Sequence, residues 1–186
     1  MFMKKLINIL GKTPEKKKVT LLFLGLSNAG KSTLLDYLIK QEFTENLDLT
    51  MGANIKNFST KMLNYNCIDL AGQKTFRVLW NNHIVYASAL IFVIDSVNFA
   101  DLQEVKEELH NLSRFLHENN YKKTVLILAN KYDLPEALDF LKLQELIDLD
   151  SLGFDNINIF NVSIKTGLNL SKAFLWLENE LMVGYH

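Results

Sequence analysis

The sequence predicts a doubly wound α/β fold, in which helices cover both faces of a mostly parallel, six-stranded sheet. Six short apolar runs alternate with stretches of helical periodicity, and this alternation is typical of such sheets. Four of the runs are almost continuously apolar, as expected for central strands that are buried on both faces. The predicted strands occupy residues 20–24, 55–63, 67–70, 89–94, 124–128 and 157–162.

Helical stretches lie between most of these strands. The first spans residues 32–41, shortly after the first strand. Two later stretches repeat apolar residues three or four positions apart, which aligns them on one face of a helix. These faces consist of Leu102, Val105, Leu109, Leu112 and Leu116 in one helix, and of Leu170, Ala173, Phe174, Leu177 and Leu181 in the other.

The second and third strands are predicted to form a hairpin. Asn64, Tyr65 and Asn66 separate them, and asparagine is common in tight turns. We therefore expect a turn at residues 64–66 and an antiparallel pair of strands at one edge of the sheet.

The composition is that of a globular protein. The chain has 186 residues, of which 48% are hydrophobic, enough for one domain with a sizeable core. Cys67 is the only cysteine, so an internal disulfide is excluded and a reducing, cytoplasmic compartment is expected. No apolar run reaches the roughly 18 residues of a membrane-spanning helix. No cleavage site follows the N-terminal apolar stretch, so we expect no secretory signal.

A phosphate-binding loop is predicted between the first strand and the first helix. Residues 25–32 read Gly-Leu-Ser-Asn-Ala-Gly-Lys-Ser, which matches the spacing of the P-loop pattern. Glycines allow the backbone to wrap around phosphates, and the start of the helix presents unpaired N–H groups. Lys31 adds a positive charge, and the hydroxyl of Ser32 can bind Mg²⁺. The pattern predicts a nucleoside phosphate ligand, against the alternative of an ordinary glycine-containing turn.

Three further polar motifs follow predicted strands. Residues 69–73 (Asp-Leu-Ala-Gly-Gln) end the third strand, 130–133 (Asn-Lys-Tyr-Asp) follow the fifth, and 163–165 (Ser-Ile-Lys) follow the sixth. Each alone has a composition common in turns and surface loops. Ligands of parallel sheets bind beyond the carboxyl ends of the strands, so we expect all these motifs beside the P-loop.

Together the motifs resemble those of the small GTPases, and within them the group of ADP-ribosylation factors (Arf), Arf-like proteins and Sar proteins. The resemblance extends from about Val19 to the C-terminus and implies the small GTPase fold. Its markers are residues 25–32, 50–54 (Thr-Met-Gly-Ala-Asn), 69–73 with Arg77, Leu79 and Trp80, 91–96 (Ile-Phe-Val-Ile-Asp-Ser), and 129–135 (Ala-Asn-Lys-Tyr-Asp-Leu-Pro).

The resemblance implies a site for GTP and GDP. Asp133 would accept hydrogen bonds from N1–H and the amino group of guanine, a pair of donors that adenine lacks, so an ATP-dependent enzyme is disfavoured. Asn130 would donate to guanine N7, and the stems of Lys131 and Lys165 would cover the two faces of the ring. The residues expected to bind nucleotide are Asn28, Ala29, Gly30, Lys31, Ser32, Thr33, Thr50, Gly72, Asn130, Lys131, Asp133, Ser163, Ile164 and Lys165.

The same resemblance implies Mg²⁺ and a hydrolytic reaction. Ser32 and Thr50 would ligate the metal, and Asp69 would hold one of its waters. The N–H of Gly72 would reach the γ-phosphate. Gln73 would be the catalytic residue that orients the attacking water.

Intrinsic hydrolysis is expected to be slow. The chain has only two arginines, Arg77 and Arg114, and neither lies in residues 42–53, the first switch of the resembling family. An arginine that stabilises the transition state is worth roughly 10³–10⁵ in rate, so the chain would depend on an activating protein. Arg77 follows Gln73 by one helical turn, and we expect it to form structural ion pairs.

The N-terminal segment is basic and amphipathic. The first 18 residues hold six lysines and one glutamate, a balance of +5, whereas the remainder carries −6. We divide the chain into an amphipathic helix and basic linker at 1–17 and a small GTPase domain at 18–186. Residues 2–10 are expected to bind a membrane surface in the GTP form, and no nucleic acid; a helix packed permanently on the domain is the alternative.

Several positions depart from the pattern of the family. Phe2 stands where N-myristoylation requires glycine, so membrane binding would rest on the helix and lysines alone and be weak and salt-sensitive. Leu49 replaces the usual proline before Thr50. The three aromatic positions that Arf effectors read are occupied by Ala53, Ile68 and His83. We therefore do not expect known Arf effectors to bind.

We expect a monomeric, cytoplasmic GTPase switch that associates peripherally with membranes in the GTP state and acts in membrane trafficking or organisation. A slowly cycling, GTP-bound scaffold is the alternative. The expected partners are guanine nucleotide, a membrane surface, and an exchange factor, an activating protein and effectors of unassigned identity.

Overall fold

The computed structural model describes residues 16–44 and 50–183, and within them one sheet has six strands in the order β2-β3-β1-β4-β5-β6. All neighbouring strands run parallel except β2 and β3, which are antiparallel. The mostly parallel six-stranded sheet with an antiparallel edge is thus confirmed. The strands are β1 (Lys17–Leu24), β2 (Ala53–Ser59), β3 (Leu63–Leu70), β4 (Ala89–Asp95), β5 (Thr124–Asn130) and β6 (Asn156–Asn161).

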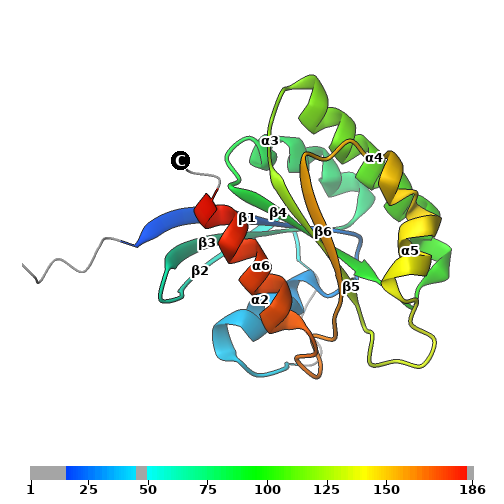
Figure 1. Ribbon diagram of the computed structural model, residues 1–186, viewed down its shortest axis with the longest axis horizontal. Coiled ribbons are helices and arrows are strands. Elements are labelled where there is room, and N and C mark those ends of the chain that lie inside the picture. The colour runs from blue at the N-terminus through cyan, green and yellow to red at the C-terminus, as the bar shows by residue number, and fades with distance from the viewer. Residues whose placement is uncertain (1–15, 45–49, 184–186) are drawn as a thin grey trace, which may run out of the picture.

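Helices cover both faces of this sheet (Figure 1). Helices α2 (Lys31–Lys40) and α6 (Leu170–Val183) pack on one face. Helices α3 (Trp80–Ile84), α4 (Leu102–Glu118) and α5 (Phe140–Ile147) pack on the other. Short 3₁₀ turns are formed by Lys74–Leu79, Phe99–Asp101 and Leu149–Ser151.

The two-residue period of the strands divides the core into two layers. In β1, Leu22 and Leu24 belong to the layer under α3, α4 and α5, whereas Leu21 and Phe23 belong to the layer under α2 and α6. Successive side chains of a strand point to opposite faces, so a strand apolar at every position is buried on both. This explains why the central strands are continuously apolar.

The predicted helical faces are buried with two exceptions, Leu102 and Phe174, which are partly buried. In α4, Val105, Leu109, Leu112 and Leu116 are buried against the sheet and Leu102 lies at its margin. In α6, Leu170, Ala173, Leu177 and Leu181 are buried, whereas Phe174 is only partly covered. Burial of these faces is the main source of helix stability in a folded domain.

The predicted position of the hairpin turn is wrong. Asn64 and Asn66 lie within β3, and Tyr65 between them is buried and stacks on Phe58 of β2. The turn instead occupies residues 60–62, where the Thr60 hydroxyl accepts hydrogen bonds from the backbone N–H groups of Met62 and Leu63, each at 3.2 Å. Burial of Tyr65 therefore outweighs the turn preference of the two asparagines.

Cys67 lies in the middle of β3, between β1 and β2. Its backbone is paired with Leu21 on one side and Lys56 on the other, and its side chain is fully buried. Burial raises the pKa of the thiol to about 12. The sulfur is therefore a neutral core group rather than a nucleophile.

The predicted N-terminal helix at residues 2–10 lies outside the described residues, as does Leu49. Strand β1 begins at Lys17, one residue before the proposed start of the domain. Within the described segments, none of the helices has the length and apolar character needed to cross a membrane.

Candidate functional site

The P-loop connects the end of β1 to the start of α2, and both of its glycines have a positive φ and a neighbour too close for a side chain. Gly25 has φ +131°, and a Cβ there would lie 2.2 Å from the carbonyl oxygen of Val93. Gly30 has φ +104°, and a Cβ there would lie 2.5 Å from the Asn130 amide nitrogen. Any side chain at either position would push the loop away from the neighbouring strands.

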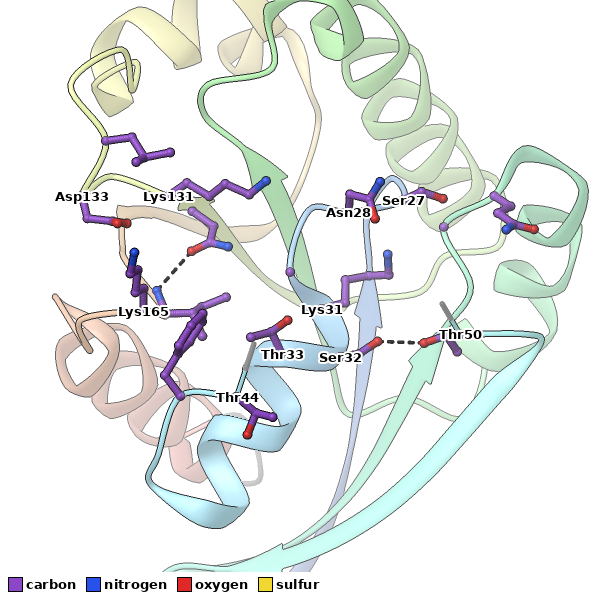
Figure 2. A pocket seen from close by; sticks show the side chains of 17 residues that line it. Ser27, Asn28, Lys31, Ser32, Thr33, Thr44, Thr50, Lys131, Asp133 and Lys165 are labelled. Atoms are coloured by element: carbon purple, nitrogen blue, oxygen red, sulfur yellow. Dashed lines mark hydrogen bonds between the residues drawn. The ribbon is translucent and has the colours of Figure 1, made fainter. Parts of the chain in front are cut away.

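A cavity of about 610 Å³ opens beside this loop, at the carboxyl ends of the parallel strands (Figure 2). This is the position expected for a ligand of a doubly wound sheet. The cavity brings together most of the predicted site residues. Those that line it are Asn28, Gly30, Lys31, Ser32, Thr33, Thr50, Gly72, Gln73, Asn130, Lys131, Asp133, Ile164 and Lys165.

Asn130 joins three of the motifs. It ends β5, is almost fully buried, and donates through Nδ2 to the carbonyl of Ala29 in the P-loop at 2.9 Å. Its Oδ1 accepts from the backbone N–H of Ile164 at 3.2 Å. One amide therefore fixes the P-loop relative to the loop after β6, and both polar ends of its side chain are satisfied.

Asp133 is oriented by the loop after β6. Ser163 donates its hydroxyl to Asp133 Oδ1 at 2.7 Å and accepts the N–H of Thr166 at 3.1 Å. Lys131 adopts a left-handed backbone conformation, and its ammonium pairs with Asp95 at the end of β4. Two predicted site residues, Ser163 and Ala29, are buried and lie behind the residues that line the cavity.

Lys31 is buried at the start of α2. Its Nζ donates to the carbonyl of Leu26 at 2.8 Å. Burial lowers the pKa of this lysine to about 8, and the nearby carboxyl of Asp69 partly opposes the shift. A second anion within the cavity would favour the charged form of Lys31 further.

Three predicted metal-site residues converge between the P-loop and the edge of the sheet. The Ser32 and Thr50 hydroxyls form a hydrogen bond of 2.7 Å, drawn as a dashed line in Figure 2. Both contact Asp69 Oδ2, at 2.5 Å from Ser32 and 3.1 Å from Thr50. Asp69 lies behind the two hydroxyls, and desolvation raises the pKa of its carboxyl.

These three side chains fit a hard divalent cation. Asp69 Oδ1 is buried without a hydrogen-bond partner, which is unusual for a carboxylate oxygen. Hydroxyl and carboxylate oxygens are the donors that Mg²⁺ prefers, and Mg²⁺ commonly uses few protein ligands together with phosphate oxygens. Residues 16–44 and 50–183 contain no cluster of three or more His, Cys, Asp or Glu side chains that could hold a metal without other ligands.

The segment after β3 lies directly on the P-loop. A Cβ on Gly72 would lie 2.4–2.5 Å from backbone atoms of residues 25–27, so only glycine allows this approach. Arg77 donates through Nε to the Gly72 carbonyl at 2.8 Å and pairs with Glu104 and Glu108 of α4. The structural ion-pair role predicted for Arg77 is confirmed, and Gln73 lines the cavity beside Gly72.

Four lining residues were not among those predicted: Ser27, Phe43, Thr44 and Leu134. Ser27 lies within the P-loop motif and Leu134 next to Asp133, so the motifs themselves contained the signal for both. Phe43 and Thr44 follow α2 and belong to no pattern in the sequence. Their place in the wall depends on tertiary contacts.

Comparison with known proteins agrees with this geometry. The sequence model of the ADP-ribosylation factor family matches residues 3–181. The chain belongs to this family. Small GTPases of the Arf family bind GTP and GDP with Mg²⁺ and act as molecular switches.

Curated Arf-like relatives match along nearly the whole chain. ADP-ribosylation factor-like protein alp41 of Schizosaccharomyces pombe is 34% identical, with 90% of this chain and 88% of the relative aligned. ADP-ribosylation factor-like protein 2 of Dictyostelium discoideum is 32% identical, with 95% of each chain aligned.

A solved Arf-family structure shares the fold. The small GTPase Arl6 BBS3 from Trypanosoma brucei, with the bound nucleotide analogue GppNp, superposes with a TM-score of 0.80 at 27% identity. The match covers 89% of this chain and 98% of that structure. The Arf-family fold assigned from the motifs is therefore confirmed.

Proposed function

We propose that this Arf-family chain is a guanine-nucleotide switch that binds GTP and GDP with Mg²⁺ and hydrolyses GTP slowly. The observation that carries the proposal is the convergence of the P-loop and the Asn-Lys-Tyr-Asp motif on one cavity, joined by the Asn130 side chain. A phosphate site and a base site within one cavity fit a nucleotide better than a free phosphate or a nucleobase.

At the base end of the cavity, the carboxylate of Asp133 is the group that selects guanine. The Ser163 hydroxyl engages Oδ1 and holds the carboxylate in place. The pairing of Lys131 with Asp95 holds the lysine stem in the cavity wall, where it covers one face of the base, and Lys165 covers the other. Adenine would leave the acceptor pair of Asp133 without donors, which is a strong basis for rejection.

At the phosphate end, the N–H groups of residues 28–33 and the Lys31 ammonium hold the phosphates. Ser32 and Thr50 would ligate Mg²⁺, and Asp69 would hold one of its waters. The bound metal would neutralise charge on the phosphates. Thr50, three residues before β2, already lies against Ser32 and Asp69, so the three side chains are close enough together to share one metal ion.

Hydrolysis would depend on Gln73, which lines the cavity and would orient the attacking water. The described wall of the cavity contains three lysines and no arginine. Arg77 is engaged by two glutamates and a carbonyl, so it is held away from the phosphates. We infer a slow intrinsic reaction that an activating protein accelerates in trans.

Membrane association would use residues 2–10 in the GTP state, without myristoylation and from a cytoplasmic, monomeric protein. Its proposed role is in membrane trafficking or organisation, with an exchange factor and effectors as further partners. The alternative is a slowly cycling, GTP-bound scaffold, and the replaced aromatic positions at Ala53, Ile68 and His83 favour effectors different from those of Arf proteins.

Two measurements test these proposals. Calorimetric titration of nucleotide-depleted protein should show GDP and GTP binding at least about a hundredfold tighter than ADP and ATP; equal affinities would overturn the guanine assignment. Flotation with anionic liposomes, with GDP or a non-hydrolysable GTP analogue bound, tests the membrane switch. Binding only in the analogue form supports it, whereas equal binding or none in both forms contradicts it.

A further inference from the structure

A buried carboxylate behind the cavity wall links three elements of the fold. Asp36 lies on α2, and its side chain is only 5% exposed. Its Oδ2 accepts hydrogen bonds from Lys40 of the same helix at 2.8 Å and from the Thr44 hydroxyl at 2.9 Å. Its Oδ1 accepts from Lys56 of β2 at 3.2 Å. The proposed function uses none of these groups.

The two lysines keep this carboxylate charged. Hydrogen bonds from Lys40, and with smaller effect from Thr44 and Lys56, lower the pKa of Asp36 to about 2 despite its burial. Asp36 is therefore a permanent acceptor at neutral pH. A buried charge of this kind is costly to leave unpaired, so the segment that supplies a donor is held in place.

One of the three donors belongs to the cavity. Thr44 and its neighbour Phe43 line it, and Figure 2 shows Thr44 on the segment that follows α2. Ser32 precedes Asp36 by four residues, so one stretch of α2 carries both the proposed metal ligand and the anchor of this wall. Among residues 16–44 and 50–183, the Thr44 hydroxyl makes its hydrogen bond to α2 with Asp36.

We propose that Asp36 is a positioning residue for the nucleotide cavity, which through Thr44 holds the wall of Phe43 and Thr44 against α2 and so slows dissociation of bound nucleotide. The inference rests on the proposed guanine-nucleotide function. Asp36 itself does not line the cavity, so its effect passes through a neighbour.

The test is the dissociation rate of a fluorescent GDP analogue, chased with excess GDP at constant Mg²⁺. Thr44→Val removes only the hydroxyl, keeps the volume, and leaves Asp36 paired with both lysines. It should release the analogue about tenfold faster, as expected for loss of a hydrogen bond to a charged group. Asp36→Ala should do the same. Lys142→Gln is the control, because Lys142 is largely exposed, lies on α5, and contacts neither Asp36 nor the cavity, and its rate should stay within about twofold of the original.

A double-mutant cycle separates positioning from general destabilisation. If Asp36 acts through Thr44, the variant with both changes should dissociate no faster than the faster of the two single variants. Multiplication of the two effects, or an unchanged rate for Thr44→Val, would overturn the proposal. Tight binding by the original protein combined with unchanged variant rates would refute only the role of Asp36. Failure of the original protein to bind guanine nucleotide would refute both.

Discussion

The two ends of the cavity are built on different parts of the sheet. The base end rests on β5, which is paired with β4 and β6 and is buried along nearly its whole length. The metal end rests partly on the β2–β3 hairpin, whose outer strand pairs with β3 alone. Met51, just before β2, and Ile55, within it, are both exposed.

The difference in burial between the two ends suits them to different roles. Segments that open locally at low cost in free energy have few buried contacts, as in β2, whereas central strands open only on global unfolding. The base end is therefore suited to constant recognition of guanine, and the metal end to rearrangement when the γ-phosphate is lost. Changes at the base end should alter the preference for guanine over adenine equally for diphosphates and triphosphates. Changes at the metal end should affect GTP more than GDP.

The largest effect is expected at the base end. Asp133→Ala should lower GDP affinity at least about a hundredfold, since the two guanine donors lose the carboxylate that accepts from both. Affinity for ADP should stay unchanged, so calorimetry should find the preference for GDP abolished. Asp155→Ala, at an exposed aspartate, is the control. An equal loss of GDP and ADP affinity would instead indicate damage to the phosphate site.

At the metal end, Gly72→Ala should impair the reaction of GTP more than the binding of GDP. The added methyl group would collide with the backbone of the P-loop, so the segment would have to move away from the γ-phosphate position. Single-turnover GTP hydrolysis should fall by about tenfold or more, while GDP affinity changes less than about threefold. Gly153→Ala is the matched control, because a Cβ there meets no atom within 4 Å. A loss of GDP affinity as large as the loss in GTP hydrolysis rate would contradict the assignment of different roles to the base end and the metal end.

An intermediate effect is expected at the connection between the metal end and α4. Arg77→Met removes the contacts with Glu104, Glu108 and the Gly72 carbonyl. Loss of these partly buried contacts should cost about 2 kcal/mol in the free energy of unfolding and about 4–8 °C in Tm. Arg114→Met, at an exposed arginine on α4, should change Tm by less than about 2 °C. Equal shifts in the two variants, measured by circular dichroism, would show that the ion pairs contribute nothing specific.

The smallest effect concerns pH. The pKa of Asp36 is about 2 in the folded protein, against an ordinary value of 3.8, because Lys40, Thr44 and Lys56 donate to the carboxylate. A depressed pKa stabilises the fold above the ordinary value and loses that contribution as pH falls toward 2. The difference in unfolding free energy between the original protein and Asp36→Asn should therefore be constant above pH 5 and shrink below pH 4. Denaturant titrations measure it, and a constant difference down to pH 2.5 would contradict the assignment.

Local motifs made most of the candidate site predictable. The P-loop, the Asp-Leu-Ala-Gly-Gln segment and the Asn-Lys-Tyr-Asp segment each place their residues through the strand they follow, so sequence order was enough to bring them together. Phe43 and Thr44 belong to no such motif. Thr44 contacts Asp36, which lies eight positions earlier in the sequence, and no sequence pattern marks that contact.

Alternation and helical periodicity likewise predicted the sheet and two of the helices, but not the hairpin turn. Asn64 and Asn66 have the composition of a turn, whereas Thr60 looks like a strand residue. The outcome depended on whether Tyr65 is buried against Phe58, and burial is a property of the assembled fold.

The buried thiol of Cys67 makes the protein its own reporter of local opening. A thiol reagent can reach this single sulfur only when the core layer beneath α2 and α6, in which its side chain is buried, opens. The labelling rate in native buffer therefore measures how often this part of the sheet opens, without any introduced probe. Comparing that rate with GDP and with a GTP analogue bound would show how strongly each nucleotide restrains the hairpin.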